Sequence, residues 1–260
     1  MIQMPEYKYI YGPVNSWRLG RSLGIDPISS GNKVCTFDCI YCQVGKARPS
    51  PPQRRVFVPT KEFIREFKSF PKVKVDYITF SGTGEPTIAK NLGNMIQAVR
   101  GLSSSKIAVI TNSTMLGRKD VQRELESIDL VEAKLDAPSN TLLRIINKPY
   151  GATSVKRIVN SIKRFRNIFK GKFILQIMFT KESIVYAEEL AKIARYIQPD
   201  GVDLNTPLRP CGIKPVSKKD IEKIRPYFKG LNVISVYDKR KKQKIKSISK
   251  KDTLKRRGKV

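Results

Sequence analysis

Three cysteines within one stretch of eight residues are the side chains with the clearest chemical potential in this sequence. The segment reads Cys35-Thr-Phe-Asp-Cys39-Ile-Tyr-Cys42. Spacings of four and three residues let a tight loop wrap one cubane iron–sulfur cluster, because such clusters are held by cysteine thiolates. Three thiolates leave the fourth iron without a nearby protein ligand, and catalytic metal centres need such an open position. The spacing therefore predicts a [4Fe–4S] cluster on Cys35, Cys39 and Cys42.

The open iron of that cluster calls for an external ligand. The amino and carboxylate groups of S-adenosylmethionine (SAM) suit it, and one electron from the cluster then cleaves the sulfonium and releases a 5′-deoxyadenosyl radical. Zinc is the alternative, but structural zinc needs four ligands, usually in two close pairs. The remaining cysteine, Cys211, lies far along the chain, and the sequence has no histidine. We expect Cys211 to be a buried or partly exposed thiol, with a substrate-side role as radical relay or ligand as the alternative.

The charge balance is strongly basic. Lysine and arginine number 51 against 22 acidic residues, which gives a formal charge of +29. This excess favours a polyanionic partner, with nucleic acid before an anionic membrane, although the charged surface of a thermophilic protein would look the same. The candidate phosphate contacts are arginines that follow the cysteine loop and cations near the C-terminus: Arg48, Arg54, Arg55, Lys239, Arg240, Lys241, Lys242, Arg256 and Arg257.

The C-terminal segment differs from the rest of the chain. Residues 239–260 hold twelve lysines or arginines and one acid, Asp252. Such a segment cannot bury enough apolar surface to fold alone, so we expect residues 238–260 to form a flexible basic tail.

The sequence also bears on the cellular compartment. The N-terminus lacks an apolar run, and no stretch of 18 apolar residues occurs. We therefore expect a cytoplasmic protein with no membrane partner. In a reducing cytoplasm the four cysteines are metal ligands or thiols rather than disulfides.

Helical and strand patterns alternate from residue 60 onward. The predicted strands are 75–80, 106–110, 129–136, 173–180, 202–205 and 231–237, and helices are predicted between them. Thr153 is the expected N-cap of one amphipathic helix. Short strands that alternate with helices indicate an α/β fold with a parallel sheet, and about six repeats fit a partial (β/α)6 barrel. We expect residues 1–34 to form an irregular lead segment and residues 35–237 to form the core domain.

Polar residues interrupt the apolar pattern of three predicted strands. Glu132, Lys134 and Asp136 share one face of their strand, Asp203 and Asn205 share a face of another, and Gln176 interrupts a third. Unpaired charge is costly in a packed sheet, so these faces are expected to line a ligand-filled lumen. The alternative is an edge strand or internal ion pairs such as Glu132–Lys134.

These motifs resemble the radical SAM superfamily. Cys35-x-x-x-Cys39-x-x-Cys42 is similar to its cluster signature, and Tyr41 occupies the aromatic position that lies by the adenine in the family. Ser81-Gly82-Thr83-Gly84-Glu85-Pro86 stands where the family has Gly-Gly-Glu-Pro, with Thr83 in place of the first glycine. The resemblance implies SAM contacts from the following residues: Tyr41, Gly82, Thr83, Gly84, Glu85, Asn112, Lys134, Asp136, Gln176 and Asn205.

Within the superfamily, GPVNSWRLGRSLGID, KLDAP and LNTPLRP look like the branch related to the tRNA wyosine-base synthase. That synthase has a second cluster on three further cysteines, whereas only Cys211 is left here. The chain therefore resembles a relative of the synthase rather than the synthase itself.

The resemblance implies an enzyme that cleaves SAM to a radical with an electron from a flavodoxin- or ferredoxin-like donor. The basic charge favours RNA, and tRNA in particular, as the substrate. The alternative is a protein or peptide partner, as for a glycyl-radical activase. A nucleic-acid-binding protein with a purely structural cluster would not explain the open iron or the polar strand faces.

Overall fold

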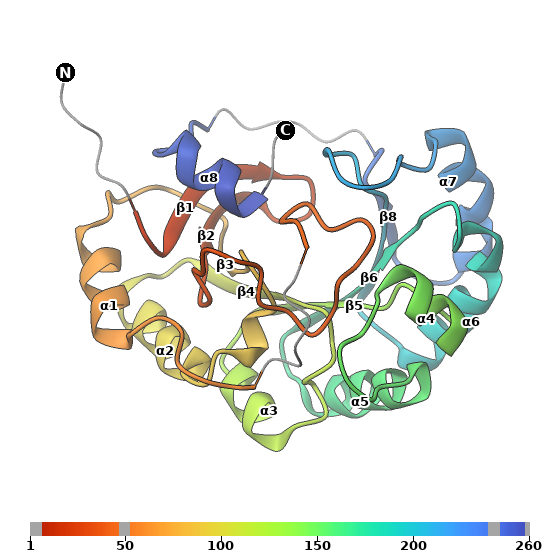
Figure 1. The fold of residues 1–260 in the computed structure, drawn as a ribbon, viewed down its shortest axis with the longest axis horizontal. Helices are drawn as coiled ribbons and strands as arrows, with labels where there is room; N and C mark the ends of the chain where they lie inside the picture. The colour runs from red at the N-terminus through yellow and green to blue at the C-terminus, as the bar shows by residue number, and fades with distance from the viewer. Residues whose placement is uncertain (1–6, 47–52, 239–244, 258–260) are drawn as a thin grey trace.

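The computed structural model describes residues 7–46, 53–238 and 245–257. Within them, eight strands form one sheet in the order β1 to β8. β1 and β2 are antiparallel, and β2 to β8 are parallel. The strands are β1 (Ile10–Ser16), β2 (Gly20–Ile25), β3 (Tyr77–Phe80), β4 (Lys106–Thr111), β5 (Leu130–Lys134), β6 (Lys172–Met178), β7 (Gly201–Asn205) and β8 (Val233–Ser235). The sheet is curled, which confirms the predicted partial barrel (Figure 1).

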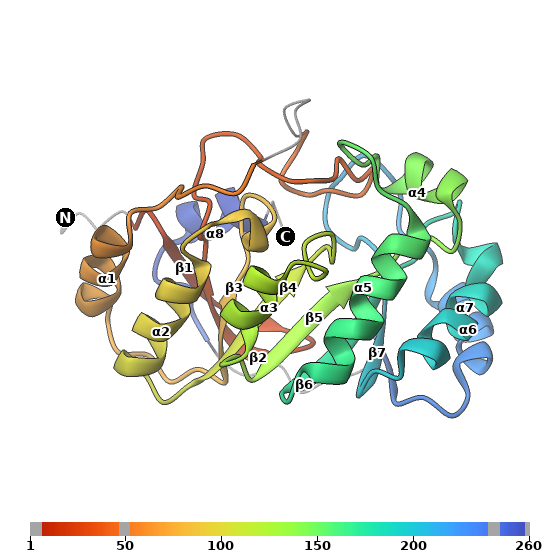
Figure 2. The same ribbon diagram turned by 90° about the horizontal axis from the view of Figure 1, so that it is seen from below.

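Helices cover the outer face of this sheet (Figure 2). They are α1 (Thr60–Ser69), α2 (Leu92–Leu102), α3 (Lys119–Leu125), α4 (Asn140–Ile146), α5 (Val155–Ile168), α6 (Ala187–Ile197) and α7 (Lys218–Ile224). The last helix, α8 (Lys250–Arg257), lies apart from this layer, against β1. α5 shows why they lie there, because Val155, Ile158, Ile162 and Phe165 recur at helical spacing and are all buried. Its N-cap is Ser154 rather than Thr153, since the Ser154 side chain accepts a hydrogen bond from the Arg157 amide.

The inner face of β5 shows how alternation fills the barrel. Leu130 packs with Leu19, Ala108 and Ile174 in a small apolar cluster. Lys134, which lies further along β5 on the same face, lines a cavity. The lumen therefore passes from an apolar floor to a polar mouth along one strand.

The segment 1–34, predicted to be mostly irregular, contributes β1 and β2 to the sheet. The glycines in this segment obscure its strand pattern. Gly24 shows why a glycine is required there. A Cβ on Gly24 would lie 2.1 Å from a ring atom of Tyr11, so only glycine lets that ring lie across β2. The barrel therefore begins before the cysteine loop, which connects β2 to α1.

The C-terminal segment also differs from prediction. Residues 250–257 form α8, which packs on β1 (Figure 1). The Gly12 amide donates to Thr253 Oγ1 at 3.1 Å, and the Ile248 amide donates to the Gly12 carbonyl at 2.8 Å. Side-chain hydrogen bonds replace the apolar surface that this segment lacks. The candidates Arg48, Lys239, Arg240, Lys241 and Lys242, and the side chain of Arg257, lie outside the described residues.

None of the helices in the described ranges is long and apolar enough to cross a membrane.

Candidate active site

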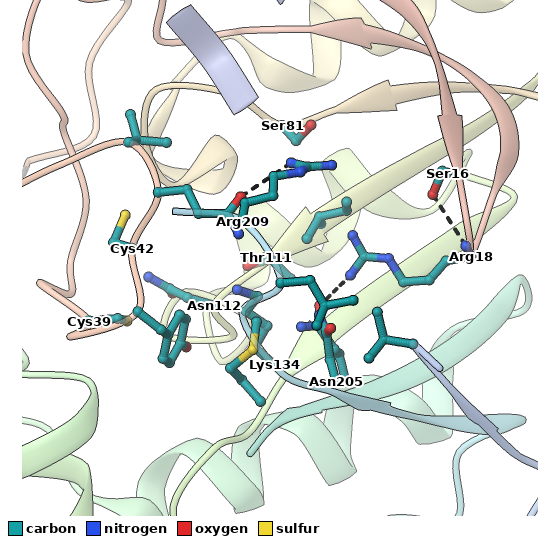
Figure 3. A pocket seen from close by; sticks show the side chains of 18 of the residues that line it. Ser16, Arg18, Cys39, Cys42, Ser81, Thr111, Asn112, Lys134, Asn205 and Arg209 are labelled. Carbon is teal, nitrogen blue, oxygen red and sulfur yellow. Dashed lines mark hydrogen bonds between the residues drawn. The ribbon is translucent and has the colours of Figure 1, made fainter. Parts of the chain in front are cut away.

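The carboxyl ends of the parallel strands surround a cavity of about 1060 Å³. Cys35, Cys39 and Cys42 all line it, and Figure 3 shows Cys39 and Cys42 on the opposite side from Arg18. Lys134, Gln176 and Asn205 line it from β5, β6 and β7. Because chemistry in (β/α) barrels sits at the carboxyl ends of the strands, this cavity is the candidate active site.

The cysteine loop is held from two sides. On one side the Glu85 amide donates to the Val34 carbonyl at 3.0 Å. On the other side the Ile40 amide donates to the Ile146 carbonyl, at the end of α4, at 2.9 Å. A Cβ on Gly84 would lie 1.8 Å from the Val34 oxygen, so glycine is required for this close approach. The loop is thus fixed to the end of β3 and to α4.

Two asparagines point their amides at the sulfurs. Asn112 Nδ2 lies 3.4 Å from Cys35 Sγ, and Asn147 Nδ2 lies 3.4 Å from Cys39 Sγ. Burial and the nearby Glu85 raise the pKa of Cys35 to about 12, and burial and Asp136 raise that of Cys39 to about 11. Cys35 and Cys39 would therefore release protons when they bind a metal, because only the thiolate is a metal ligand.

Lys33 is a cation that the sequence analysis missed. It is 5% exposed, lines the cavity and donates to Asp38 Oδ1 at 3.1 Å. Burial lowers the pKa of Lys33, but the charges of Cys42, Cys35 and Asp38 outweigh burial and raise it. The ammonium group thus balances the negative charge that thiolates carry when they bind iron.

These features fit a [4Fe–4S] cluster. Three thiols face one cavity, amide donors point at two of the sulfurs, and a buried cation lies beside them. The donors are sulfurs, which iron–sulfur clusters prefer. Among residues 7–46, 53–238 and 245–257, no three Cys, Asp or Glu side chains converge on a site for a single metal ion.

Glu85 is a buried carboxylate between β3 and β4. Its Oε2 accepts a hydrogen bond from the backbone amide of Asn112 at 2.6 Å. Its Oε1 accepts from the hydroxyls of Thr87 and Thr111, at 2.6 and 2.7 Å. Burial raises the pKa of Glu85, and these hydrogen bonds oppose the rise. Glu85 lines the cavity beside the cysteines, where it would suit a cationic ligand group.

Asp136, predicted to contact the cofactor, does not line the cavity. Its Oδ1 accepts from the Met178 amide at 2.9 Å, and its Oδ2 accepts from Asn147 Nδ2 at 2.8 Å and from the Tyr41 hydroxyl. Burial and then Asp136 raise the pKa of Tyr41 well above its usual range. Asp136 therefore orients Tyr41, whose ring centroid lies 5.1 Å from Lys134 Nζ.

Thr83 also points away from the cavity, in contrast to the prediction. Its amide and hydroxyl both donate to Asp26 Oδ2, at 3.1 and 2.9 Å. Gly82 has a φ of 149°, and a Cβ there would lie 2.3 Å from the Asp26 carboxyl carbon. Ser81, Gly82, Gly84 and Glu85 line the cavity and Thr83 does not, so at its two glycines this loop presents backbone to a ligand.

Arg18 closes the lumen below the cavity. Its Nη1 donates to Gln176 Oε1 at 2.6 Å and pairs with Glu132. The partner of Glu132 is therefore Arg18, and not the Lys134 that the alternative ion pair would have used. No local pattern indicates this contact, because 114 residues separate Arg18 from Glu132.

The arginines predicted to bind phosphate have different surroundings. Arg54 pairs with Asp120 and Glu124, and its side chain is 8% exposed. The Arg256 side chain is 2% exposed and pairs with Asp26. Their charges are already neutralised inside the protein, so these two positions are corrected from surface contacts to internal ion pairs. Arg55 is exposed, and its guanidinium carbon lies 4.9 Å from the Phe57 ring centroid.

Comparison with solved structures supports the fold. A radical SAM methyltransferase from Sphaerobacter thermophilus aligns with a TM-score of 0.65 at 16% identity, over 84% of this chain and 67% of that chain. SuiB from Streptococcus suis, bound to S-adenosylmethionine, gives 0.61 at 18% identity, over 78% of this chain and 48% of SuiB. Archaeal TYW1 gives 0.54 at 13% identity, over 87% of this chain and 78% of that chain. At these identities the alignments show a shared fold, and they do not single out the wyosine-synthase branch.

Sequence comparison identifies the family. Residues 30–195 match the model of the Radical SAM superfamily. The chain is 38% identical to a UPF0026 protein of Synechocystis sp., over 81% of this chain and 78% of that protein. It is also 34% identical to a Brachyspira hyodysenteriae protein named GTPase Obg, over 95% of this chain but only 38% of that longer protein. With its three cysteines on one cavity at the strand ends, the chain belongs to the radical SAM superfamily, and its relatives include UPF0026 proteins.

Proposed function

We propose that this radical SAM enzyme holds one [4Fe–4S] cluster on Cys35, Cys39 and Cys42, binds SAM in the adjoining cavity and modifies RNA. When bound, these cofactors would supply one-electron cleavage of the sulfonium and a 5′-deoxyadenosyl radical. The observation that supports the proposal most is that all three cysteines share a cavity of about 1060 Å³ with Glu85.

The chain's own residues have distinct tasks in this proposal. Asn112 and Asn147 orient the sulfurs of Cys35 and Cys39. Glu85 offers a carboxylate to the methionine ammonium group, and the backbone of Gly82 and Gly84 leaves room for that end of the ligand. Tyr41, whose hydroxyl is held by Asp136, presents an apolar ring to the adenine.

The lower part of the cavity would complete the cofactor site. Lys134, Gln176 and Asn205 lie on neighbouring strands, with Lys134 beside Gln176 and Met178 beside Asn205 in register. Their side chains would hydrogen-bond the ribose and adenine. Arg18 and Gln176 seal the lumen beneath, which keeps bulk water away from a reactive radical.

The direct test of the chemistry is anaerobic reconstitution with iron and sulfide, followed by SAM and dithionite. We expect about four irons per chain and formation of 5′-deoxyadenosine. Iron binding without 5′-deoxyadenosine in repeated assays would contradict the proposed cleavage. A flavodoxin- or ferredoxin-like protein should replace dithionite as the electron donor.

RNA is the proposed substrate because of the formal charge of +29. A tRNA modification like that of the wyosine branch is the finer form of this proposal. The test is tRNA binding at several salt concentrations, since release of counterions makes phosphate binding salt-dependent. Changing Lys239, Arg240, Lys241 and Lys242 to Gln should weaken binding and flatten its salt dependence. The matched control removes four exposed lysines elsewhere: Lys156, Lys170, Lys219 and Lys229.

A peptide substrate is the second candidate. SuiB, which was solved with its precursor peptide SuiA, aligns with a TM-score of 0.63 at 18% identity. If no RNA shows salt-sensitive binding, this candidate becomes the better one.

A further inference from the structure

A fully buried carboxylate lies just beyond β2, behind the proposed cofactor loop. Asp26 is 0% exposed. Its Oδ1 accepts from the Ser29 amide at 2.9 Å, and its Oδ2 accepts from the Thr83 amide at 3.1 Å and from the Thr83 hydroxyl at 2.9 Å. Asp26 thus ties the end of β2 to the loop after β3. A buried charge of this kind is costly unless a counter-charge accompanies it.

The counter-charge comes from Arg256 on α8. Its Nε lies 3.3 Å from Asp26 Oδ2, and the two side chains are 2% and 0% exposed. The guanidinium group also donates to Ser29 Oγ at 3.1 Å and to the Lys8 carbonyl. Arg256 Nε has no aligned hydrogen-bond partner, so its contact with Asp26 is mainly electrostatic. The basic segment therefore delivers one arginine to the inside of the barrel end.

Arg256 reaches the same loop by a second route. Its guanidinium carbon lies 5.8 Å from the Tyr11 ring centroid. The Tyr11 hydroxyl is hydrogen-bonded to Ser81 Oγ at 2.6 Å. Ser81 and Gly82 line the cavity. Arg256 therefore contacts two residues, Asp26 and Tyr11, that each hold the loop Ser81–Glu85 from behind.

We infer that Arg256 is a positioning residue for the cofactor loop, and that α8 is an integral part of the active site. Without Arg256, Asp26 would lose its counter-charge and draw in water, and its hold on the Thr83 backbone would weaken. The loop presents backbone groups to the ligand, so a shift at Thr83 moves Gly82 and Gly84 as well. The consequence for SAM rests on the proposed function, whereas the consequence for the loop does not.

The test compares Arg256→Ala with Lys250→Ala in reconstituted protein. Lys250 is exposed on the same helix, so its removal deletes the same charge without touching Asp26. Hydrogen–deuterium exchange should show the amides of residues 81–85 exchanging about tenfold faster in Arg256→Ala, as loss of one charge-assisted contact implies. SAM affinity, measured by equilibrium dialysis without reductant, should fall about tenfold, with iron content unchanged. Lys250→Ala should match the wild type in all three measurements.

Arg256→Lys is the second variant, because removing the guanidinium entirely could prevent folding. Lysine keeps the charge but cannot reach Asp26, Ser29 and Lys8 together, so its exchange rate and SAM affinity should lie between wild type and Arg256→Ala. Wild-type exchange at residues 81–85 in a folded Arg256 variant would overturn the inference. Equal acceleration over all strands would also overturn it, by showing a general loss of stability. If the wild type fails to bind SAM, the proposed function fails, but the exchange rates still decide the role of Arg256.

Discussion

The side-chain amide of Asn147 lies 3.4 Å from the sulfur of Cys39, although 108 residues separate the two. The same nitrogen donates to Asp136 at 2.8 Å, so its position is fixed from a second direction. Hydrogen bonds to cluster sulfurs raise the reduction potential, because they stabilise the extra negative charge of the reduced state.

Asn147→Ala should therefore lower the reduction potential of the reconstituted cluster. One net hydrogen bond of about 1 kcal/mol corresponds to a shift of roughly 40 to 50 mV for a one-electron couple. A redox titration followed by electron paramagnetic resonance measures this shift. Asn94→Ala, at an exposed position on α2, is the control and should leave the potential unchanged. An unaltered potential in Asn147→Ala would mean that the amide does not reach the sulfur in the loaded protein.

Cysteine substitution should separate cluster ligands from the fourth thiol. Cys35→Ala, Cys39→Ala or Cys42→Ala should abolish stable cluster binding, because each removes one of three protein ligands. Cys211→Ala should keep about four irons, since Cys211 is not among the cavity-lining residues and donates to the Ile213 carbonyl at 3.3 Å. Iron analysis and the visible spectrum report both outcomes. Cluster loss in Cys211→Ala would show that all four irons have protein ligands.

Gly84→Ala should destabilise the protein and impair cluster loading. The added Cβ would lie 1.8 Å from the Val34 oxygen, which forces the cysteine loop away from β3. Overpacking of this kind costs about 1–3 kcal/mol of unfolding free energy. Gly101→Ala is the matched control, because a Cβ there meets nothing within 4 Å and Gly101 lies in α2. The unfolding free energy of that control, measured by urea titration, should rise by about 0.5–1 kcal/mol. Equal effects of the two changes would contradict the close approach of Gly84 to Val34.

Asp120 should make stability depend on pH in the acid range. Hydrogen bonds from Arg118, and then from Arg54, lower the pKa of Asp120 below its usual value. Because the folded pKa lies below the unfolded pKa of about 3.9, the ionised carboxylate stabilises the folded state above that pH. The contribution is lost as the pH falls through the folded value. Urea titrations between pH 3 and 7 should therefore show that the free energy of unfolding falls less steeply with acid in Asp120→Asn than in wild type. Glu126→Gln, an exposed acid just beyond α3, should retain the wild-type profile.

Periodicity and local motifs predicted the part of the fold that they encode. The six strands from β3 to β8 were predicted, because apolar runs bounded by turns mark them. β1 and β2 were missed, since their pattern depends on contacts such as Tyr11 over Gly24 that no local window contains. α8 was missed for a similar reason, as its buried residues include Asp252, Thr253 and Arg256 rather than apolar residues.

The candidate site divides in the same way. Cys35, Cys39, Cys42 and Glu85 belong to contiguous motifs, and the structure gathers them at one cavity. Asp136 and Thr83 belong to motifs too, but their side chains point to Tyr41 and Asp26, a direction that spacing does not encode. Asn147 and Arg18 carry no motif signal, because each acquires its partner only through tertiary packing. Lys33 pairs with the nearby Asp38, but neither residue belongs to the cysteine spacing that marks the site.

The ion pair between α8 and the barrel end has a consequence for biosynthesis. Ser29 and Arg256, which share a hydrogen bond, are 227 residues apart in the chain. At translation rates of roughly 5–20 residues per second, roughly 10 to 45 seconds pass between the synthesis of these two residues. For most of that interval the nascent chain carries its cysteine loop, the carboxylate of Asp26 and Thr83, but no arginine to neutralise that carboxylate. The ribosome thus imposes an order of assembly, in which the cysteine loop is made long before the residue that completes the support of the neighbouring loop.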